Sequence, residues 1–408
     1  MIKTDAAALD RTDSLASKRE LFALPTGVVY LDGNSLGALP TAAIDAVDHA
    51  VKKEWGEGLI RSWNTAGWVD LAVRVGVKIA ALIGAPGDSV VACDSTSVNL
   101  YKALHAACNL RPDRRIILTD IDNFPTDLYL IDSVAKERGL TVKALPRDEI
   151  LAALTDEVAV VELTHVDYRT AQMYDLAEVT AAAHAVGALT IWDLAHSAGA
   201  VPIDLMKADA DFAIGCGYKY LNGGPGAPAF IYVSPQLADL TSQPLKGWHG
   251  HAHPFEFSRF YEPALGVDRM LVGTPSILSL TALSAALDVF DGVSMSELRN
   301  KSLALSTFFY ALADEHLISR GFTIESERDP AKRGSHIALS HAGGYSIARA
   351  LIERGVIGDF RRPNILRFGL APLYNSFADV TRLVTECIDV VDTGFYLEPR
   401  FATEAAVV

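Results

Sequence analysis

The fold of this chain is decided by two apolar runs that follow each other closely. The first reads Ala188-Leu-Thr-Ile-Trp-Asp193, and the second reads Phe212-Ala-Ile-Gly-Cys-Gly-Tyr-Lys219, with Asn222-Gly-Gly-Pro-Gly226 just after it. Each run is short, and the flanking turn residues favour a buried strand. Asp193 and Lys219 therefore stand at strand ends, and open α/β sheets bind ligands at the carboxyl ends of their strands.

The pairing of Asp193 with Lys219 indicates a cofactor. A lysine amine can condense with an aldehyde, and a buried aspartate can hold a pyridine nitrogen in its protonated form. Pyridoxal phosphate (PLP) requires these two groups from a protein. A carboxylate after Ile191-Trp192 is costly to bury without a cationic partner, and a structural Arg or Lys could also be that partner. The pair alone leaves both interpretations open.

The surrounding pattern predicts two domains. Short apolar runs alternate with amphipathic stretches from about residue 75 to about 235, which is typical of βα units around a parallel sheet. In one unit Asp175 and Glu178 form a predicted capping box, and Gly187 is a suitable residue to end the helix. After Gly273 comes a long helical region, then strands at 336–339 and 365–370 around a helix at 345–354. We expect a large, mainly parallel-sheet domain and a smaller α+β domain.

Composition excludes several classes of partner. With 408 residues the chain exceeds a single ordinary core. A net charge of −14 disfavours nucleic acid, whose phosphates require clustered Lys and Arg. No apolar run approaches the roughly 18 residues of a membrane span, and the first residues lack the apolar core of a signal peptide. The four cysteines are scattered, so we expect a cytoplasmic protein with no membrane partner.

A second polar cluster lies upstream, at a predicted strand-to-helix junction. The strand Val90–Cys93 is followed by Asp94-Ser-Thr-Ser97 and then by a helical pattern. The hydroxyls of Ser95 and Thr96, together with free helix amides, could bind an anion. An ordinary N-cap is the alternative, and it is favoured when the segment is considered alone.

Several motifs spread over nearly the whole chain resemble kynureninase. Besides the two runs that end in Asp193 and Lys219, they are Leu31-Asp-Gly-Asn-Ser-Leu-Gly37, Leu59-Ile-Arg-Ser-Trp-Asn64, Asn123-Phe-Pro-Thr-Asp127, Arg333-Gly-Ser-His336, Arg354-Gly-Val-Ile-Gly-Asp359 and Arg367-Phe-Gly369. Each motif is weak alone, and the combination is highly specific. The resemblance implies the fold type I (PLP-dependent transferase-like) α/β architecture, with an N-terminal segment 1–60, a PLP-binding domain 61–272 and a small domain 273–408.

The resemblance also implies a set of cofactor contacts. Lys219 matches the lysine that carries the cofactor, Asp193 matches the partner of the pyridine nitrogen, and Phe124 matches an aromatic that stacks on the ring. A core position is the alternative for Phe124. The residues that match cofactor contacts are Ser95, Thr96, Phe124, Pro125, Thr126, Asp127, Thr164, Asp193, His196, Tyr218, Lys219, Trp248 and Thr274. Of these, Trp248 and Thr274 are expected to reach the cofactor from a partner subunit.

The implied reaction is the hydrolysis of L-kynurenine to anthranilate and L-alanine in tryptophan catabolism, by a homodimer with shared active sites. Lys219 would move the α-proton, and Tyr218 could assist as an acid–base group with a lowered pKa. The alternative role for Tyr218 is a hydrogen bond to the cofactor phosphate, which is the safer assignment. The residues expected to contact substrate are Asn34, Ser35, Trp63, Gly273 and Arg367. The Trp63, Gly273 and Thr274 set resembles the bacterial-type pocket, which predicts a preference for kynurenine over 3-hydroxykynurenine.

Arg367 admits two interpretations. It alternates with Leu366 and Phe368, so its side chain is expected on the opposite face of a strand. A structural ion pair is the usual role of such an arginine, whereas the resemblance implies that the guanidinium binds the substrate α-carboxylate, which suits its forked geometry. We favour the second interpretation because a strand would hold the fork rigidly.

Other functions stay open at this stage. A cysteine desulfurase needs a mobile thiol, and Cys93, Cys108, Cys216 and Cys387 all lie in apolar strand or helix patterns. An aminotransferase, or a binding protein that kept the fold without catalysis, is a further alternative. The run His249-Gly-His-Ala-His253 suggests a metal site, but no acidic or cysteine partner lies at ligand spacing, so we expect a loop near the active site and no metal.

Overall fold

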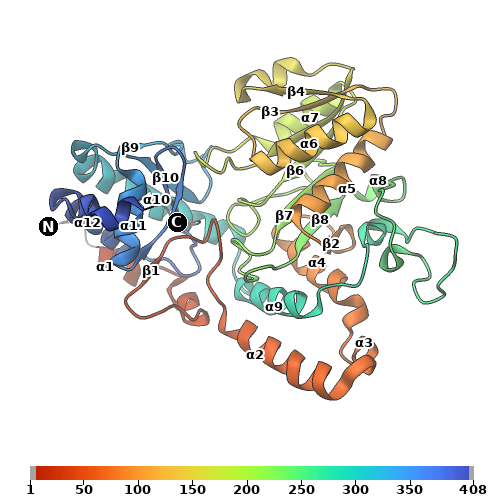
Figure 1. The fold of residues 1–408 in the computed structure, drawn as a ribbon, viewed down its shortest axis with the longest axis horizontal. Helices are drawn as coiled ribbons and strands as arrows, with labels where there is room; N and C mark the ends of the chain where they lie inside the picture. The colour runs from red at the N-terminus through yellow and green to blue at the C-terminus, as the bar shows by residue number, and fades with distance from the viewer. Residues whose placement is uncertain (1–5, 404–408) are drawn as a thin grey trace.

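Seven strands form the central sheet of the larger lobe in the computed structural model, which describes residues 6–403 (Figure 1). The spatial order is β2-β8-β7-β6-β5-β3-β4, and all neighbours from β7 to β4 run parallel, while β8 is antiparallel to β7 and β2. The strands are β2 (Val90–Ala92), β3 (Ile116–Asp120), β4 (Thr141–Leu145), β5 (Val158–Thr164), β6 (Leu189–Asp193), β7 (Phe212–Cys216) and β8 (Ala229–Val233). The predicted, mainly parallel sheet is therefore confirmed.

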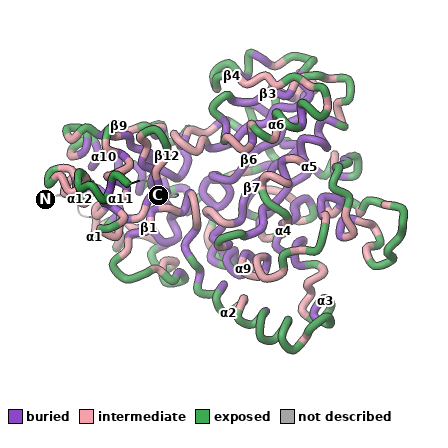
Figure 2. The backbone as a smooth tube through the Cα atoms, viewed as in Figure 1, coloured by how far each residue is buried: buried purple, intermediate pink, exposed green. Residues whose placement is uncertain are grey.

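The central strands are apolar because both faces of the sheet are covered. Every residue of β5, β6 and β7 is buried, as in parallel sheets with helices on both sides (Figure 2). The covering helices include α4 (Leu71–Leu82), α5 (Thr96–Asn109), α6 (Pro125–Arg138) and α7 (Leu176–Ala185). Thr164 pairs in register with Asp193, so polar side chains at the carboxyl ends of β5 and β6 lie beside each other.

The helix α7 begins and ends largely as its sequence predicts. The backbone amide of Glu178 donates to Asp175 Oδ1 at 2.9 Å, and Gly187 takes the left-handed φ of +76° that suits a residue just past a helix. Among the described residues, the bond from the Glu178 side chain back to the cap is not formed. The capping box was therefore half correct.

The smaller lobe is an antiparallel sheet packed on helices. Its strands are ordered β12 (Asp359–Arg361), β13 (Ile365–Gly369), β10 (His336–Ser340) and β9 (Thr323–Ile324). The helices are α10 (Met295–His316), α11 (Gly344–Glu353) and α12 (Phe377–Asp392). The chain's start joins this lobe, since β1 (Val29–Tyr30) pairs in parallel with β11 (Val356–Ile357) and α1 (Ala6–Arg11) packs on α12.

The long helical region predicted after Gly273 is two helices. The helix α9 (Ile277–Leu287) meets α10 at a bend of 80°. Leu280 and Leu283 of α9 join the core of the large sheet, where α9 packs against α2 (Thr41–His49) and α4. The domain boundaries given above stay a proposal, and this packing favours moving the last one from residue 273 toward residue 298.

Within residues 6–403, no single helix combines the length and apolar character of a membrane span. The two helical segments Ile277–Phe290 and Met295–His316, bent by 80° at their junction, together have the length and composition of a span, and they meet these two criteria only.

Candidate active site

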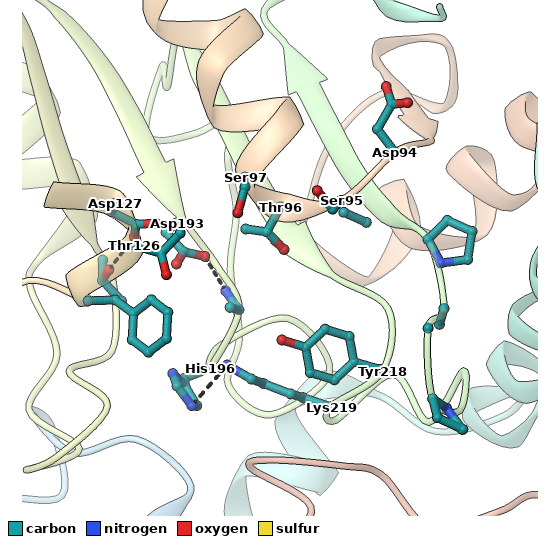
Figure 3. Close-up of a pocket in the computed structure, with 18 of the residues that line it drawn as sticks. Asp94, Ser95, Thr96, Ser97, Thr126, Asp127, Asp193, His196, Tyr218 and Lys219 are labelled. Carbon is teal, nitrogen blue, oxygen red and sulfur yellow. Dashed lines mark hydrogen bonds between the residues drawn. The ribbon is translucent and has the colours of Figure 1, made fainter. Parts of the chain in front are cut away.

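One cavity of about 500 Å³ lies at the carboxyl ends of β5 and β6, against the first turn of α5 (Figure 3). The residues expected to contact the cofactor that line it are Ser95, Thr96, Phe124, Thr126, Asp127, Thr164, Asp193, His196, Tyr218 and Lys219. Further lining residues that the sequence analysis did not select are Asp94, Ser97, Ala195, Pro225, Gly226, Ala227, Pro228, Ala229 and Ser276. The structure thus brings most of the expected set together from five separate stretches of chain.

Lys219 lies beside His196 in this cavity. Its Nζ is 3.3 Å from His196 Nε2, and the same ring nitrogen is 3.1 Å from the carbonyl oxygen of Asn34. Burial, and then the nearby charge of Lys219, hold the pKa of His196 well below its ordinary value. The imidazole is therefore neutral at physiological pH and can bond to Lys219 without repelling it.

The N-terminal segment approaches the backbone of Lys219 closely. The amide of Gly37 donates to the Tyr218 carbonyl at 2.8 Å, and a Cβ at position 37 would clash with the Lys219 carbonyl oxygen. The amide of Asn222 donates to that same oxygen at 2.9 Å. Only glycine allows this contact, so residues 34–37 form part of the wall around the lysine.

Two carboxyl groups meet at the far side of the cavity. Asp193 ends β6, is 3% exposed, and accepts a bond from the Ala195 amide at 2.7 Å. Asp127 comes from the first turn of α6 and is equally buried. Burial raises the pKa of both groups, and the charge of Asp193 raises that of Asp127 further, while Lys219 opposes both shifts. Two such carboxyls share a proton or require a cation between them.

A buried polar network holds these carboxyls in place. Asn123 donates to Glu162 Oε2 at 2.7 Å and accepts from the Thr164 hydroxyl at 2.5 Å and the Phe124 amide at 2.7 Å. Burial and the charge of Asp193 raise the pKa of Glu162 to about 8. The sequence analysis missed Asn123 and Glu162 as supporting residues. The alternation of Glu162 with Thr164 on one face of β5 was the available signal.

The polar segment 94–97, which carries three hydroxyl side chains, serves two purposes. Ser95 is the N-cap of α5, and its Oγ accepts from the Val98 amide at 3.3 Å, so the ordinary capping interpretation holds for this residue. Thr96 and Ser97 begin the helix, and both line the cavity together with Ser95 (Figure 3). The start of a 14-residue helix thus faces the cavity, which suits an anionic group there.

Phe124 and Tyr218 flank the lysine. The Lys219 Nζ lies 5.9 Å from the centroid of each ring, and Phe124 packs edge-on against Tyr168 at 5.3 Å. Burial raises the pKa of Tyr218 above its ordinary value, helped by the charges of Cys216 and Asp193. The lowered pKa expected for this phenol is therefore wrong, because desolvation outweighs the nearby cation. Pro125 fills the first turn of α6 and does not line the cavity.

Arg367 is held by an ion pair. It is 1% exposed on β13, its Nε donates to Asp359 Oδ1 at 2.8 Å, and its Nη2 contacts the other oxygen of Asp359. Further bonds reach the Tyr168 carbonyl and Ser35 Oγ, the latter at 3.2 Å. The structural ion pair considered above is thus present. A role of Arg367 in binding the substrate carboxylate stays a proposal, and it requires Asp359 to release part of the guanidinium group.

The remaining expected contacts lie outside this cavity. Trp63 and Trp248 pack edge-on at 5.9 Å, and Gly273 and Thr274 are exposed. The ring of His249 bonds to the Val69 carbonyl at 3.2 Å, and that of His251 bonds to the Phe260 carbonyl at 3.0 Å. Across residues 6–403, no three His, Cys, Asp or Glu side chains gather where they could hold a metal ion.

The groups around the cavity fit PLP. A primary amine, a deeply buried carboxylate that needs a cation, an aromatic ring and the start of a helix correspond to the aldehyde, pyridine nitrogen, ring face and phosphate of that molecule. The volume also lies in the range of small-molecule sites.

Comparison with known proteins decides the family. A family model described as the kynureninase C-terminal domain matches residues 298–387. A kynureninase of Pseudomonas fluorescens is 49% identical over 412 residues and is matched over 99% of each chain. This chain belongs to the kynureninase family. A kynureninase of Burkholderia mallei (strain SAVP1) is 48% identical over 413 residues, with the same coverage.

Kynureninase membership confirms the fold type I architecture, the PLP cofactor, the small-molecule substrate and the class of hydrolase acting on carbon–carbon bonds of ketonic substrates. Two solved structures share the fold. Cysteine desulfurase CsdA from Escherichia coli has a TM-score of 0.79 at 23% identity, covering 94% of this chain and 99% of its own. A C-DES variant with glycine linked covalently to its PLP cofactor has a TM-score of 0.78 at 17% identity, covering 91% and 99%. At these identities the likeness shows the fold alone, and the desulfurase alternative is not favoured.

Proposed function

We propose that this kynureninase hydrolyses L-kynurenine to anthranilate and L-alanine, with Lys219 as the residue that carries the cofactor and moves the α-proton. One observation supports this assignment most directly. Lys219, His196 and Asp193 meet in a single cavity at the carboxyl edge of the parallel sheet, although Lys219 follows β7 and the other two lie at the end of β6. No other lysine lines that cavity among the described residues.

When bound, PLP supplies an electron sink for the charge that is left on the substrate α-carbon. The protein's part is to hold and move protons. Asp193, held by the Ala195 amide and lying against Asp127, would keep the proton on the pyridine nitrogen. Lys219 Nζ accepts the α-proton and returns it within reach of the neutral His196 ring.

The hydrolytic step adds water across the Cβ–Cγ bond. The hydroxyl joins the carbonyl carbon to give anthranilate, and the β-carbon receives a proton to give alanine. A phenol with a raised pKa is a proton donor at neutral pH and a poor base. Tyr218 therefore acts in our proposal as the acid that protonates the β-carbon, or as a neutral hydrogen-bond donor to phosphate.

Substrate recognition draws on both lobes. We assign Arg367 to the substrate carboxylate, with Asn34 and Ser35 beside it; Ser35 Oγ already contacts the guanidinium. Trp63, Trp248, Gly273 and Thr274 act, in this proposal, in the cavity of a second copy of the chain. Their place outside their own chain's cavity, and the exposure of Gly273 and Thr274, support a homodimer with shared sites. The four unpaired cysteines support a cytoplasmic location.

A fluorescence assay tests the function. Purified protein with PLP and L-kynurenine is expected to release fluorescent anthranilate, and Lys219→Ala is expected to lose both this activity and the absorbance band of the lysine-bound cofactor. The matched control is Lys78→Ala, because Lys78 lies on α4 and does not line the cavity. If the absorbance band of the lysine-bound cofactor appears without release of anthranilate, the chain is a binding protein. Release of sulfide from cysteine would indicate a desulfurase.

A further inference from the structure

A fully buried lysine stands behind one end of the cavity. Lys102 on α5 is 0% exposed, and its Nζ donates to Asp94 Oδ2 at 2.7 Å and to the Met270 carbonyl at 2.6 Å. A third contact, at 3.5 Å, reaches Cys93 Sγ. Burying an ammonium costs several kcal/mol unless it is fully paired, so a surface lysine would be the ordinary choice here. The reaction described above gives Lys102 no role.

Its partner Asp94 lies at the end of the cavity that is suited to an anion. Asp94 lines the cavity next to Ser95 and Thr96, and its side chain is 27% exposed. Its backbone takes a left-handed φ of +52°, fixed by a bond from the Ala229 amide to its carbonyl at 3.0 Å. A carboxylate beside a phosphate would repel it, because like charges placed together cost several kcal/mol.

The geometry shows how this repulsion is avoided. Asp94, Ser95 and Thr96 occupy the same end of the cavity, and the Asp94 carboxylate points away from Lys219 and His196 (Figure 3). The ion pair to Lys102 holds the carboxylate in that direction and cancels its charge.

We propose that Lys102 is a positioning residue for the cofactor phosphate: by pairing with Asp94 it neutralises that carboxylate and fixes the turn that presents Ser95 and Thr96. The proposal rests on the proposed placement of the phosphate at this loop. Lys102 does not touch the phosphate in this arrangement and acts through Asp94.

The same ammonium links a second segment to the site. The Met270 carbonyl that it holds begins the stretch that passes through Gly273 and Thr274 to Ser276, which lines the cavity. Lys102 therefore connects the phosphate loop of one chain with the residues that we assign to the partner's site. Loss of the ammonium is expected to loosen both.

Titration of the apoenzyme with PLP and with pyridoxal, which lacks the phosphate, tests the proposal. Lys102→Met keeps the length of the side chain and removes its charge. We expect the Kd for PLP, measured by absorbance, to rise at least about tenfold, and the Kd for pyridoxal to change less than about threefold. A purely structural lysine would weaken both ligands alike, and that result would overturn the proposal.

Lys78→Met is the matched control. Lys78 also donates to a distant carbonyl, that of Ser284 at 2.8 Å, and to the carboxylate of Asp288, but its side chain is 38% exposed and away from the cavity. The Kd for PLP is expected to stay at the wild-type value. A rise equal to that of Lys102→Met would show that the loss of any helical lysine pair has this effect, and would contradict the proposal.

A second substitution separates neutralisation from direct attraction. In the Lys102→Met background, Asp94→Asn removes the unpaired carboxylate and is expected to restore most of the PLP affinity. If affinity stays low, Lys102 does not act through Asp94. Should Lys102→Met fail to fold, Lys102→Gln, which removes the charge and keeps a hydrogen-bond donor, is titrated in its place. The same selective loss of PLP affinity is expected, and an equal loss of pyridoxal affinity would overturn the proposal.

Thr96→Ala distinguishes failure of this proposal from failure of the cofactor placement. A loss of PLP affinity with unchanged pyridoxal affinity would support the phosphate at this loop. If Thr96→Ala has that effect while Lys102→Met has none, only the role of Lys102 is wrong. If Thr96→Ala affects neither ligand, the phosphate lies elsewhere and the proposed site fails with it.

Discussion

Two groups of expected site residues behave differently in this molecule. Those at strand ends and helix starts, such as Asp193, Thr164 and Thr96, converge in one cavity of a single chain. Those between Trp248 and Thr274, together with Trp63, lie outside it. The first group is positioned by the sheet, whose register brings carboxyl ends together. In our proposal the second group acts in the site of a second copy of the chain, and predictions can be made separately for each group.

The largest effect is expected within the first group. Asp193→Asn keeps the shape and removes the charge that holds the pyridine proton, so kcat is expected to fall by about 10²-fold or more. The absorbance of the bound cofactor should shift as well. Asp132→Asn, which removes an exposed surface carboxylate of α6, is the control. An unchanged kcat in the Asp193 variant would remove that residue from the mechanism.

The second group gives a complementation experiment. Trp248→Ala and Lys219→Ala homodimers are each expected to be nearly inactive, whereas a refolded equal mixture should recover roughly a quarter of wild-type activity, because half of the dimers carry one intact shared site. Recovery would be absent if each cavity used only its own chain. In that case Trp248 would act only within its own chain.

The preference for one substrate ring over another provides a further test of the second group. If Trp63 and Gly273 line the partner's pocket, kcat/KM should favour kynurenine over 3-hydroxykynurenine by about tenfold, since an apolar pocket leaves a hydroxyl unpaired. Trp63→His should narrow this ratio by offering a polar partner. A preference for the hydroxylated substrate in the wild-type enzyme would show that the pocket is built otherwise.

The smallest effect is expected for Glu162, a buried residue whose pKa is influenced by the charge of Asp193. The pKa of Glu162 is raised to about 8, so the folded protein keeps a proton there that the unfolded chain loses near its ordinary value. This stabilisation is complete at low pH and is lost as the pH rises toward and through 8. The Tm of the apoenzyme should therefore fall over that range, and Glu162→Gln should reduce the fall by a few degrees. Parallel Tm curves for the two proteins would show that the folded protein does not keep this proton on Glu162.

Local signals in the sequence were sufficient for much of this architecture. The strand end at Asp193, the cap at Asp175 and the turn at Gly187 depend on neighbours within a few residues, and each was predicted where it lies. The position of Lys219 near His196 followed from the resemblance, and the sheet explains it.

Long-range packing accounts for what was missed. Arg367 faces Asp359 because β12 and β13 pair in a specific register, which strand periodicity does not reveal. Glu162 looks like an interruption in an apolar strand until Asn123 is placed beside it. The pKa of Tyr218 depends on the depth of burial, and the helix α9 joined the large core because its apolar face meets α4.

The pairing of β1 with β11 has a consequence for how the chain is made. Val29 emerges from the ribosome before the strands of the large sheet, and its partner Val356 emerges after them. The large sheet can assemble in the interval, since its strands are close in sequence, while the first strand waits without its neighbour. Because Gly37 packs against the backbone of Lys219, we expect the surroundings of the active lysine to be completed only after Val356 has been synthesised.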